Sequence, residues 1–492
     1  MSQMNRRRFL QTTAATTAGL GACAHMESRS GSAQSNPNII LIVADDLGYN
    51  ELGCFGQTKI QTPNLDKLAA DGMRFTQFYC GQAVCAPSRC VLMTGKHTGH
   101  SYIRNNKEAK PEGQFPIPAD TFTIAKMLKQ QGYATAAIGK WGLGPPGSSG
   151  DPAKQGFDLF FGYNCQRNAH NYYPEYLYRN AERVPLPGND RTLTGEHFAP
   201  DLMLDEALNF IDDNKKAPFF LYYPTPVPHL ALQAPEDSIA QYKGQWDDPP
   251  YDGKGGGYLP HETPRACYAA MITRMDRDIG RILSRVEKHG LDENTLIIFS
   301  SDNGATYLKG PDVEFFESNK PLRAYKGSLY EGGIRVPTIA RWTGKIKPGS
   351  VSNHLGAFWD ILPTIADVTN SETPDDIDGI SIAPALFEDG IQPQHESLYW
   401  EFPAYGGQQA LRMGDWKTVR QNLMRKNGDQ STQLYNLAND IGETTNLASV
   451  YPNVVKKMED LMESARTPSP EFPFPTLDHL NKKLQPQRYL LK

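Results

Sequence analysis

The feature that most constrains the fold is a set of short, unbroken apolar runs that recur along the chain. The first, at residues 38–44, reads NIILIVA, and similar runs lie at 134–138, 219–223 and 295–299. Such runs are typical of strands buried on both faces of a parallel sheet. Helical patterns alternate with them, at 64–70, 123–131, 201–213 and 265–289. The alternation predicts an α/β fold with a large, mixed, mostly parallel sheet sandwiched by helices.

The sequence pattern changes after about residue 390. Short apolar segments separated by Gly- and Asn-rich turns predict a small antiparallel sheet, a helix is expected over 453–464, and the tail is Pro-rich. A chain of 492 residues is long enough for about two domains. We therefore expect a large α/β domain over 36–390, and a small C-terminal α+β subdomain with an irregular tail over 391–492.

Residues 1–35 have the pattern of a targeting segment and linker. Residues 6–10, RRRFL, resemble a twin-arginine export signal, and residues 20–23, LGAC, resemble the lipobox of bacterial lipoproteins. We expect export by the twin-arginine pathway to the periplasm, or tethering to the outer membrane of a bacterium, with a lipid anchor on Cys23. The alternative is cleavage near Ala22 and release as a soluble protein.

Charge and cysteine content narrow the function classes. A net charge of −5 gives no basic field of the kind that binds nucleic acid, so no nucleic-acid partner is expected. The seven cysteines form no CxxC pair and have no zinc-ligand spacing. No disulfide framework is indicated, although a single bridge stays open.

Acidic side chains follow two of the expected strands. Asp45 and Asp46 follow the first run, and Asp302 and Asn303 follow the run at 295–299. Adjacent carboxylates at a buried strand end repel each other unless a cation compensates, and Ca²⁺ and Mg²⁺ prefer oxygen ligands. Parallel strands end at one edge of a sheet, so a shared divalent metal site is expected there. The alternative is a solvated pair of loops.

The run Cys85-Ala-Pro87-Ser-Arg89 has the pattern of a helix start. Pro87 suits the first turn, which places Cys85 at a helix N-terminus, where anions are favoured, and Arg89 one turn on along the same face. By themselves these residues indicate an activated thiolate or an anion pocket. The alternative is a buried structural cysteine.

Residues 85–96, CAPSRCVLMTGK, resemble the signature of the type I, formylglycine-dependent sulfatases, the arylsulfatase A-like branch of the alkaline phosphatase superfamily. The resemblance extends over about residues 36–465 and includes 434–437, LYNL, with Glu443 downstream. It implies a sulfuric ester hydrolase in which a separate formylglycine-generating maturation enzyme oxidises Cys85. The hydrated aldehyde of the resulting formylglycine then attacks sulfur.

The resemblance also assigns the remaining site residues. The family's metal ligands correspond to Asp45, Asp46, Cys85, Asp302 and Asn303, and one Ca²⁺ per chain is expected, with Mg²⁺ less favoured. Arg89, Lys140 and Lys326 match the groups that stabilise charge on the sulfuryl oxygens. His229 matches the histidine that contacts the ester oxygen and donates a proton to the departing alcohol.

One position departs from the family pattern. Many members read Gly-Lys-Trp-His-Leu-Gly, where the histidine helps to eliminate sulfate, but this chain has Gly142 in place of that histidine. We expect His170, in the polar and aromatic segment 163–173, to act as the substitute base. The alternative is that His170 contacts substrate.

The expected substrate is a sulfated saccharide, with galactose or N-acetylgalactosamine sulfate favoured. The aromatic run from Tyr172 and Tyr173 to Tyr178 suits stacking on sugar faces, and equally suits simple packing. Two other functions stay open: a phosphonate or phosphate ester hydrolase of the same superfamily, and a non-catalytic lipoprotein that binds sulfated glycans.

Overall fold

The structure is a computed structural model that describes residues 36–254 and 258–478. The expected export signal at 6–10 and the lipobox cysteine Cys23 lie outside the described residues. The described residues all belong to one compact unit. No helix in the described ranges is long and apolar enough to cross a membrane.

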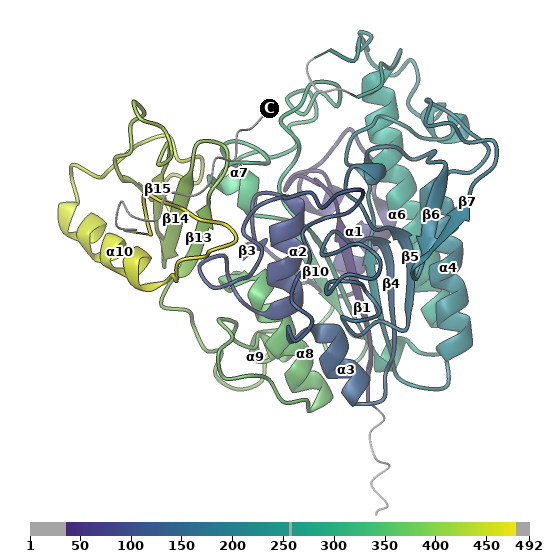
Figure 1. The fold of residues 1–492 in the computed structure, drawn as a ribbon, viewed down its shortest axis with the longest axis horizontal. Coiled ribbons are helices and arrows are strands. Elements are labelled where there is room, and N and C mark those ends of the chain that lie inside the picture. Colours follow the sequence, from purple (N-terminus) through teal and green to yellow (C-terminus); the bar gives the residue numbers. More distant parts are fainter. Residues whose placement is uncertain (1–35, 255–257, 479–492) are drawn as a thin grey trace, which may run out of the picture. The chain divides into compact units, whose positions relative to one another are not determined.

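The centre of this unit is a ten-stranded sheet with the order β11-β2-β10-β9-β1-β8-β4-β5-β6-β7 (Figure 1). Its five middle strands are parallel: β9 (Thr295–Ser301), β1 (Asn38–Ala44), β8 (Phe219–Pro224), β4 (Ala134–Lys140) and β5 (Leu159–Tyr163). The flanking strands are β2 (Met73–Phe75), β6 (Tyr176–Arg179), β7 (Glu182–Pro185), β10 (Thr338–Arg341) and β11 (Ser350–Ser352). Four of the flanking pairings are antiparallel and one, β11 with β2, is parallel. The predicted mixed, mostly parallel sheet is confirmed.

The side chains of β1 show how the sheet is buried on both faces. Ile39, Leu41 and Val43 pack into one apolar cluster, and the alternate residues Ile40 and Ile42 pack into a second. The first cluster includes residues of α2 (Cys85–Thr94), α3 (Ile124–Gln130) and α8 (Ile361–Thr369). The second includes residues of α1 (Pro63–Ala70), α4 (Ala199–Asn214) and α6 (Pro264–Lys288). Helices therefore cover both faces, as the unbroken apolar runs require.

The helices begin where the sequence supplies suitable first-turn residues. A proline lies in the first two positions of α1, α4 and α6, where its missing N–H leaves no helical hydrogen bond unmade. Thr123 caps α3 by accepting a hydrogen bond from the Lys126 N–H. The shorter elements are β3 (Phe78–Tyr79), α5 (Glu236–Ile239), α7 (Glu331–Ile334), β12 (Gly356–Ala357) and α9 (Ala383–Phe387).

The C-terminal segment forms the predicted small antiparallel sheet. Its strands are β13 (Leu398–Phe402), β14 (Gln408–Met413), β15 (Trp416–Arg420) and β16 (Gln433–Asn436), and the helix is α10 (Pro452–Ser464). Met458 and Met462 of α10 pack on one face of this sheet. Trp400 and Phe402 on the other face belong to the same apolar cluster as α2 and α8. The small sheet thus shares a core with the large one, and the boundary near residue 390 stays a prediction.

A buried ionic cluster joins the two sheets. Lys417 of β15 contacts Glu331 Oε1 of α7 at 2.9 Å and Glu443 Oε1 at 3.0 Å, and all three side chains are buried. Burial and the neighbouring Glu331 raise the pKa of Glu443 to about 7, although Lys417 opposes this. Glu331 has its pKa lowered to about 2, because Lys417 and Arg412 outweigh the effect of burial. Lys417 is therefore the cation that bridges the two carboxylates.

Loss of the Lys417 ammonium should destabilise the protein strongly. We expect Lys417→Met to lower the free energy of unfolding by about 3–5 kcal/mol, because it leaves the buried Glu443 without a cation. The surface pair of Lys456 and Asp460 provides the control, and Lys456→Met should leave the stability almost unchanged. Thermal unfolding followed by circular dichroism measures both, and equal losses in the two variants would contradict the prediction.

Candidate active site

The acidic residues meet at the carboxyl ends of β1 and β9. Ala44 is in register with Ser301, so Asp45 and Asp46 lie beside Asp302. The Asp302 N–H donates to the Ala44 carbonyl at 3.0 Å, and the Asp46 N–H donates to Asp302 Oδ1 at 3.2 Å. The two acidic strand ends predicted from sequence therefore form one buried group.

Cys85 is the first residue of α2 and points into this group. Its Sγ lies 3.2 Å from Asp45 Oδ1, 3.5 Å from Lys140 Nζ and 3.6 Å from Lys326 Nζ. Lys140 is the last residue of β4, and Lys326 precedes α7. Residues distant in the sequence thus converge on one sulfur atom.

The Cys85 thiol is neutral in this environment. Burial and the negative charge of Asp45 raise its pKa far above that of a free cysteine, although Lys140 and Lys326 act in the opposite direction. An activated thiolate, one of the two functions indicated by the residues alone, is therefore disfavoured. The six cysteines of the described residues are all free: Cys54, Cys80, Cys85, Cys90, Cys165 and Cys267.

Three cations balance the three carboxylates. The pairs are Arg89 with Asp302, Lys140 with Asp45, and Lys326 with Asp46. Arg89 contacts Asp302 Oδ2 through both Nη2 at 2.7 Å and Nε at 3.0 Å. Burial alone would raise the pKa of Asp45, but Lys140 and the other nearby cations hold it well below its usual range. Burial and the charge of Asp45 raise the pKa of Asp302 to about 6.

The residues present fit a divalent cation. Ligand atoms of Asp45, Asp46, Cys85 and His229 all lie within 4.8 Å of one another. Asn303 Nδ2 donates to Asp46 Oδ1 at 2.7 Å, whereas the buried Asn303 Oδ1 has no hydrogen-bond partner among the described residues. A buried carbonyl oxygen left unpaired costs about 1–3 kcal/mol, and a cation bound there would remove that cost.

His229 follows β8 in a loop that turns back over the site. His229 Nδ1 lies 2.6 Å from the Leu230 carbonyl, which can only accept, so Nδ1 carries the proton and Nε2 faces Asp46 Oδ2 at 3.6 Å. Burial and the charges of Lys326 and Lys140 hold the pKa of His229 well below its usual value. The imidazole is therefore neutral in the substrate-free site.

His170 stacks on His229 and does not occupy the position of the missing family histidine. Their ring centroids are 4.6 Å apart and the planes differ by 8°. Burial and His229 lower the pKa of His170 to about 2. The structure thus brings His170 to the edge of the site as a neutral imidazole.

The space beside Gly142 is taken by Gln166. Gly142 has φ of +80°, and a Cβ added there would lie 3.0 Å from Gln166 Nε2. Gln166 Nε2 and both side-chain polar atoms of Asn164 are buried without a hydrogen-bond partner in the described part of the chain. The sequence did not single out these two amides. The only available signal was their position after β5, next to the strand that carries Lys140.

The aromatic run after His170 is packed in the interior. Tyr172, Tyr173 and Tyr178 are all buried, so they do not form the sugar-stacking surface suggested by the sequence, and the packing alternative holds. The Tyr172 hydroxyl lies 2.6 Å from both the Pro226 and the His229 carbonyl oxygens. Tyr172 therefore supports the loop that presents His229.

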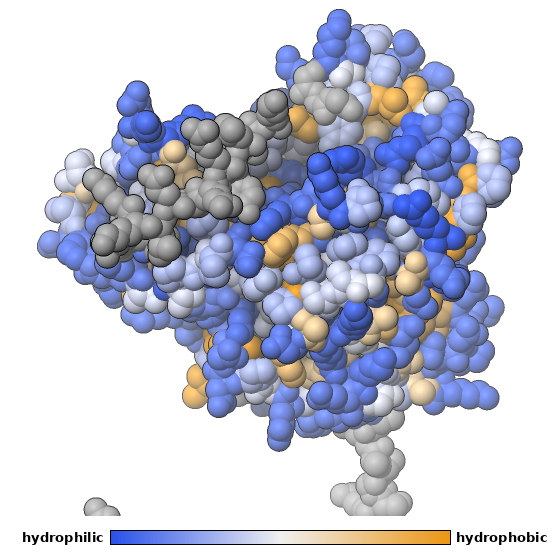
Figure 2. Space-filling view, viewed as in Figure 1, coloured by the Kyte–Doolittle hydropathy of each residue, from blue (hydrophilic) through white to orange (hydrophobic). Residues whose placement is uncertain are grey.

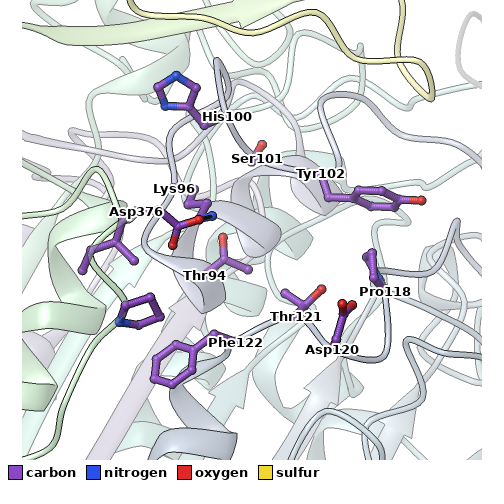
Figure 3. Close-up of a pocket in the computed structure, with 12 residues that line it drawn as sticks. Thr94, Lys96, His100, Ser101, Tyr102, Pro118, Asp120, Thr121, Phe122 and Asp376 are labelled. Carbon is purple, nitrogen blue, oxygen red and sulfur yellow. Dashed lines mark hydrogen bonds and ion pairs between the residues drawn. The ribbon is translucent and has the colours of Figure 1, made fainter.

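A separate pocket lies at the other end of α2. It has a volume of about 420 Å³, and Figure 3 shows Lys96 and Asp376 together on one side of it, with Tyr102 on the other. Nearby, His97, His100 and Asp378 form a second group of candidate metal ligands. However, His97 Nδ1 accepts a hydrogen bond from the Gly99 N–H at 3.1 Å, which leaves the proton on Nε2, the nitrogen that faces Asp378. Because metal-bound histidines donate from their free nitrogen, this group fits a cation poorly.

Comparison with known proteins identifies the family. The family model described as Sulfatase matches residues 37–371, more than half of the chain. The chain belongs to the sulfatase family. A second model, described as N-sulphoglucosamine sulphohydrolase, C-terminal, matches residues 325–468. The sulfatase assignment and the fold class predicted from sequence are confirmed.

Named sulfatases share sequence over most of the chain. Rat N-acetylgalactosamine-6-sulfatase is 33% identical over 72% of this chain, a match that spans 66% of the rat enzyme. Human arylsulfatase A is 31% identical over 86% of this chain and 87% of its own length. The crystal structure of Ps i-CgsB in complex with k-i-k-neocarrahexaose is 30% identical, covers 87% of this chain and 92% of its own, and has a TM-score of 0.75. Sulfatases are sulfuric ester hydrolases that generally use a formylglycine and a divalent metal.

Proposed function

We propose that this sulfatase hydrolyses sulfate esters of carbohydrates, with galactose or N-acetylgalactosamine sulfate as the favoured substrates. The observation that carries the proposal is the convergence of Lys140 and Lys326 on Cys85 inside a buried site, with Arg89 beside them at Asp45. Such fixed cations stabilise negative charge that develops during group transfer, at no cost in reorganisation. The names of the relatives support a sulfated sugar as the substrate class.

A divalent cation, Ca²⁺ rather than Mg²⁺, would be held by Asp45, Asp46, Asp302, Asn303 and residue 85. There it would orient a hydroxyl of the nucleophile and lower its pKa. Calcium is favoured because it accepts six to eight oxygen ligands in flexible geometry, whereas Mg²⁺ demands a near-ideal octahedron and retains several waters.

Cys85 requires oxidation to formylglycine for this chemistry. The neutral, buried thiol is a poor nucleophile, whereas a hydrated aldehyde would supply a hydroxyl that attacks sulfur and can later expel sulfate. As Cys85 is fully buried in the folded chain, a maturation enzyme must act before folding is complete. Arg89, Lys140 and Lys326 would then bind the sulfuryl oxygens as the bond from sulfur to the alcohol oxygen breaks.

His229 would protonate the departing alcohol. Its Nε2 faces the site, but the imidazole is neutral before substrate binds. A sulfate ester places negative charge against the same lysines that lower the pKa of His229, which favours the imidazolium once substrate is bound. His229 would therefore take up its proton when the substrate binds.

Release of sulfate requires a base, and His170 is the proposed one. Gln166 occupies the space next to Gly142, but an amide has no basic lone pair at neutral pH and can only donate a hydrogen bond to a sulfate oxygen. His170 stacks on His229 and is neutral. Burial and the nearby positive charges lower its pKa to about 2, and the negative sulfate group left on the enzyme would raise that pKa towards the range in which an imidazole acts as a base.

We also propose that the protein is exported by the twin-arginine pathway and retained through a lipid on Cys23, in the periplasm or at the outer membrane. The support is the sequence of residues 6–10 and 20–23. Since this pathway carries folded proteins, oxidation of the buried Cys85 would take place before export.

The mass of the peptide that contains Cys85 tests the nucleophile. We expect protein co-expressed with a maturation enzyme to show sulfur and two hydrogens replaced by one oxygen, and to hydrolyse sulfate esters faster than phosphate or phosphonate esters. Cys85→Ala should fold but lose activity. Faster phosphonate hydrolysis would assign the other hydrolase class, and full activity of unmodified protein would contradict the formylglycine.

Calcium should stabilise the protein through the carboxylate site. After dialysis against a chelator, Ca²⁺ at 100 times its Kd should add about 2.7 kcal/mol, read as a rise in Tm, and Mg²⁺ should add less. Asn303→Ala should reduce the rise, whereas the control His100→Ala, in the second ligand group, should keep it. The opposite result for the two variants would show that the cation binds at the second ligand group and not at Asp45 and Asp46.

Loss of His170 should slow the release of sulfate without slowing the release of the alcohol. In single-turnover kinetics on a sulfate ester, we expect His170→Ala to release the alcohol at nearly the wild-type rate and sulfate at least about tenfold more slowly, within the range for a general base. Gln166→Ala, which removes an amide but no base, should leave the two rates coupled. Wild-type sulfate release from His170→Ala would show that His170 is not the base.

A further inference from the structure

Two exposed tyrosines lie side by side near the proposed active site. Tyr307, in the loop after β9, is 48% exposed, and Tyr405, in the turn between β13 and β14, is 50% exposed. Their ring centroids are 6.1 Å apart at 85°, and their hydroxyl oxygens are 3.4 Å apart. The two rings therefore form one exposed aromatic surface to which the large domain and the small sheet each contribute a residue.

The pair lies directly beside the residue that reaches Cys85. A Cβ added to Gly327 would lie 3.0 Å from a ring carbon of Tyr405, and the preceding residue, Lys326, places its Nζ 3.6 Å from Cys85 Sγ. Burial of part of the ring and the neighbouring Tyr307 raise the pKa of Tyr405, while the charge of Lys326 opposes them. The tyrosines are thus continuous with the sulfate-binding cations.

Tyr405 is held in an unfavourable backbone conformation. Its φ is +50°, the left-handed region that costs a non-glycine residue about 1–2 kcal/mol. Its ring is stacked on Phe402, with centroids 5.3 Å apart and planes 27° apart. The turn is fixed to the large domain, since Gln408 Nε2 donates to the Gly327 carbonyl at 2.7 Å. The Tyr405 ring is therefore held in a fixed position beside Gly327.

Exposed apolar surface is limited to small groups on the face of the molecule drawn in Figure 2, where hydrophilic residues predominate. A flat protein or lipid partner would need a larger apolar area than two rings provide. Two tyrosines instead match the size and the mixed polarity of a sugar ring, which has a C–H face and a rim of hydroxyls.

We propose that Tyr307 and Tyr405 bind a pyranose ring of the substrate chain that is not the sulfated ring being hydrolysed. The inference rests on the proposed function and specifies its substrate as an oligosaccharide or polysaccharide. The aromatic faces pack against the sugar C–H groups, and the tyrosine hydroxyls exchange hydrogen bonds with sugar hydroxyls. Lys326 directs the sulfate towards Cys85 while the neighbouring ring rests on the tyrosines.

The test compares long and short substrates. Wild-type enzyme is screened on sulfated tetrasaccharides from chondroitin and carrageenan, and the one hydrolysed fastest is compared with the corresponding sulfated monosaccharide. We expect Tyr307→Ala and Tyr405→Ala to raise KM for the tetrasaccharide about tenfold, with KM for the monosaccharide changed less than about twofold. Phe variants at both positions keep the rings and should lose less.

We call Tyr307 and Tyr405 the tyrosine platform. Controls distinguish loss of sugar binding at this platform from general effects on the fold. Tyr451 is 43% exposed and packs on Trp416 in the C-terminal subdomain, so Tyr451→Ala should leave both KM values unchanged. Tyr405→Asn, a residue that tolerates positive φ, replaces Tyr405→Ala if the alanine variant fails to fold. Tetrasaccharide binding to Cys85→Ala protein, measured by calorimetry with and without Tyr405→Asn, gives a readout independent of turnover.

Four other experimental outcomes would each contradict a specific part of the proposal. Equal effects on tetrasaccharide and monosaccharide would contradict the platform. A rise in KM in Tyr102→Ala, and not in the Tyr405 variants, would place the chain in the pocket at the other end of α2. Hydrolysis of 4-nitrophenyl sulfate without activity on any saccharide would contradict the platform and the carbohydrate substrate together. Absence of activity on every sulfate ester would contradict the proposed function itself.

Discussion

The pairing of three buried carboxylates with three buried cations is the constraint on which the site depends. Asp45, Asp46 and Asp302 are the direct continuation of strands in the middle of the sheet, so backbone register fixes their separation before any side chain packs. Charges placed there without partners would each cost several kcal/mol, and Arg89, Lys140 and Lys326 meet that cost. The partners come from α2, β4 and the segment before α7. The ionic cluster therefore requires most of the fold to be in place, and the fold in turn is stabilised by its completion.

Continuous apolar runs and strand-end residues were sufficient to predict most of the architecture. A run such as 38–44 can be buried only between two helical layers, and strands that end at one edge bring Asp45 near Asp302 whatever the loops do. The C-terminal strands were recognisable because their apolar segments are separated by turn residues. The domain boundary near residue 390 is harder to predict from the sequence, because Trp400 and Phe402 belong to the same apolar core as residues of α2 and α8.

Loop geometry accounts for what the sequence could not give. Whether Tyr172 stacks on a ligand or is buried depends on how the segment after β5 folds back, and local composition is the same in both cases. Gln166 and Asn164 are ordinary amides whose significance comes from burial without a partner. Tyr307 and Tyr405 are 98 positions apart in the sequence and become neighbours only through the contact between the small sheet and the large domain. The charged centre was predictable because it is attached to regular strands, and its surroundings were not.

The position of Tyr405 has a consequence for how such an enzyme can diversify. Tyr405 lies in the turn between β13 and β14, which contributes no proposed metal ligand or nucleophile. Lys417, on β15 after the next turn of the same sheet, secures that sheet to the interior. Exchanges of Tyr405 would change the exposed surface beside Gly327 without replacing the anchoring lysine or a residue that contacts Cys85. Under the proposed role of Tyr405, selection can act on substrate choice and on catalysis through separate stretches of the chain.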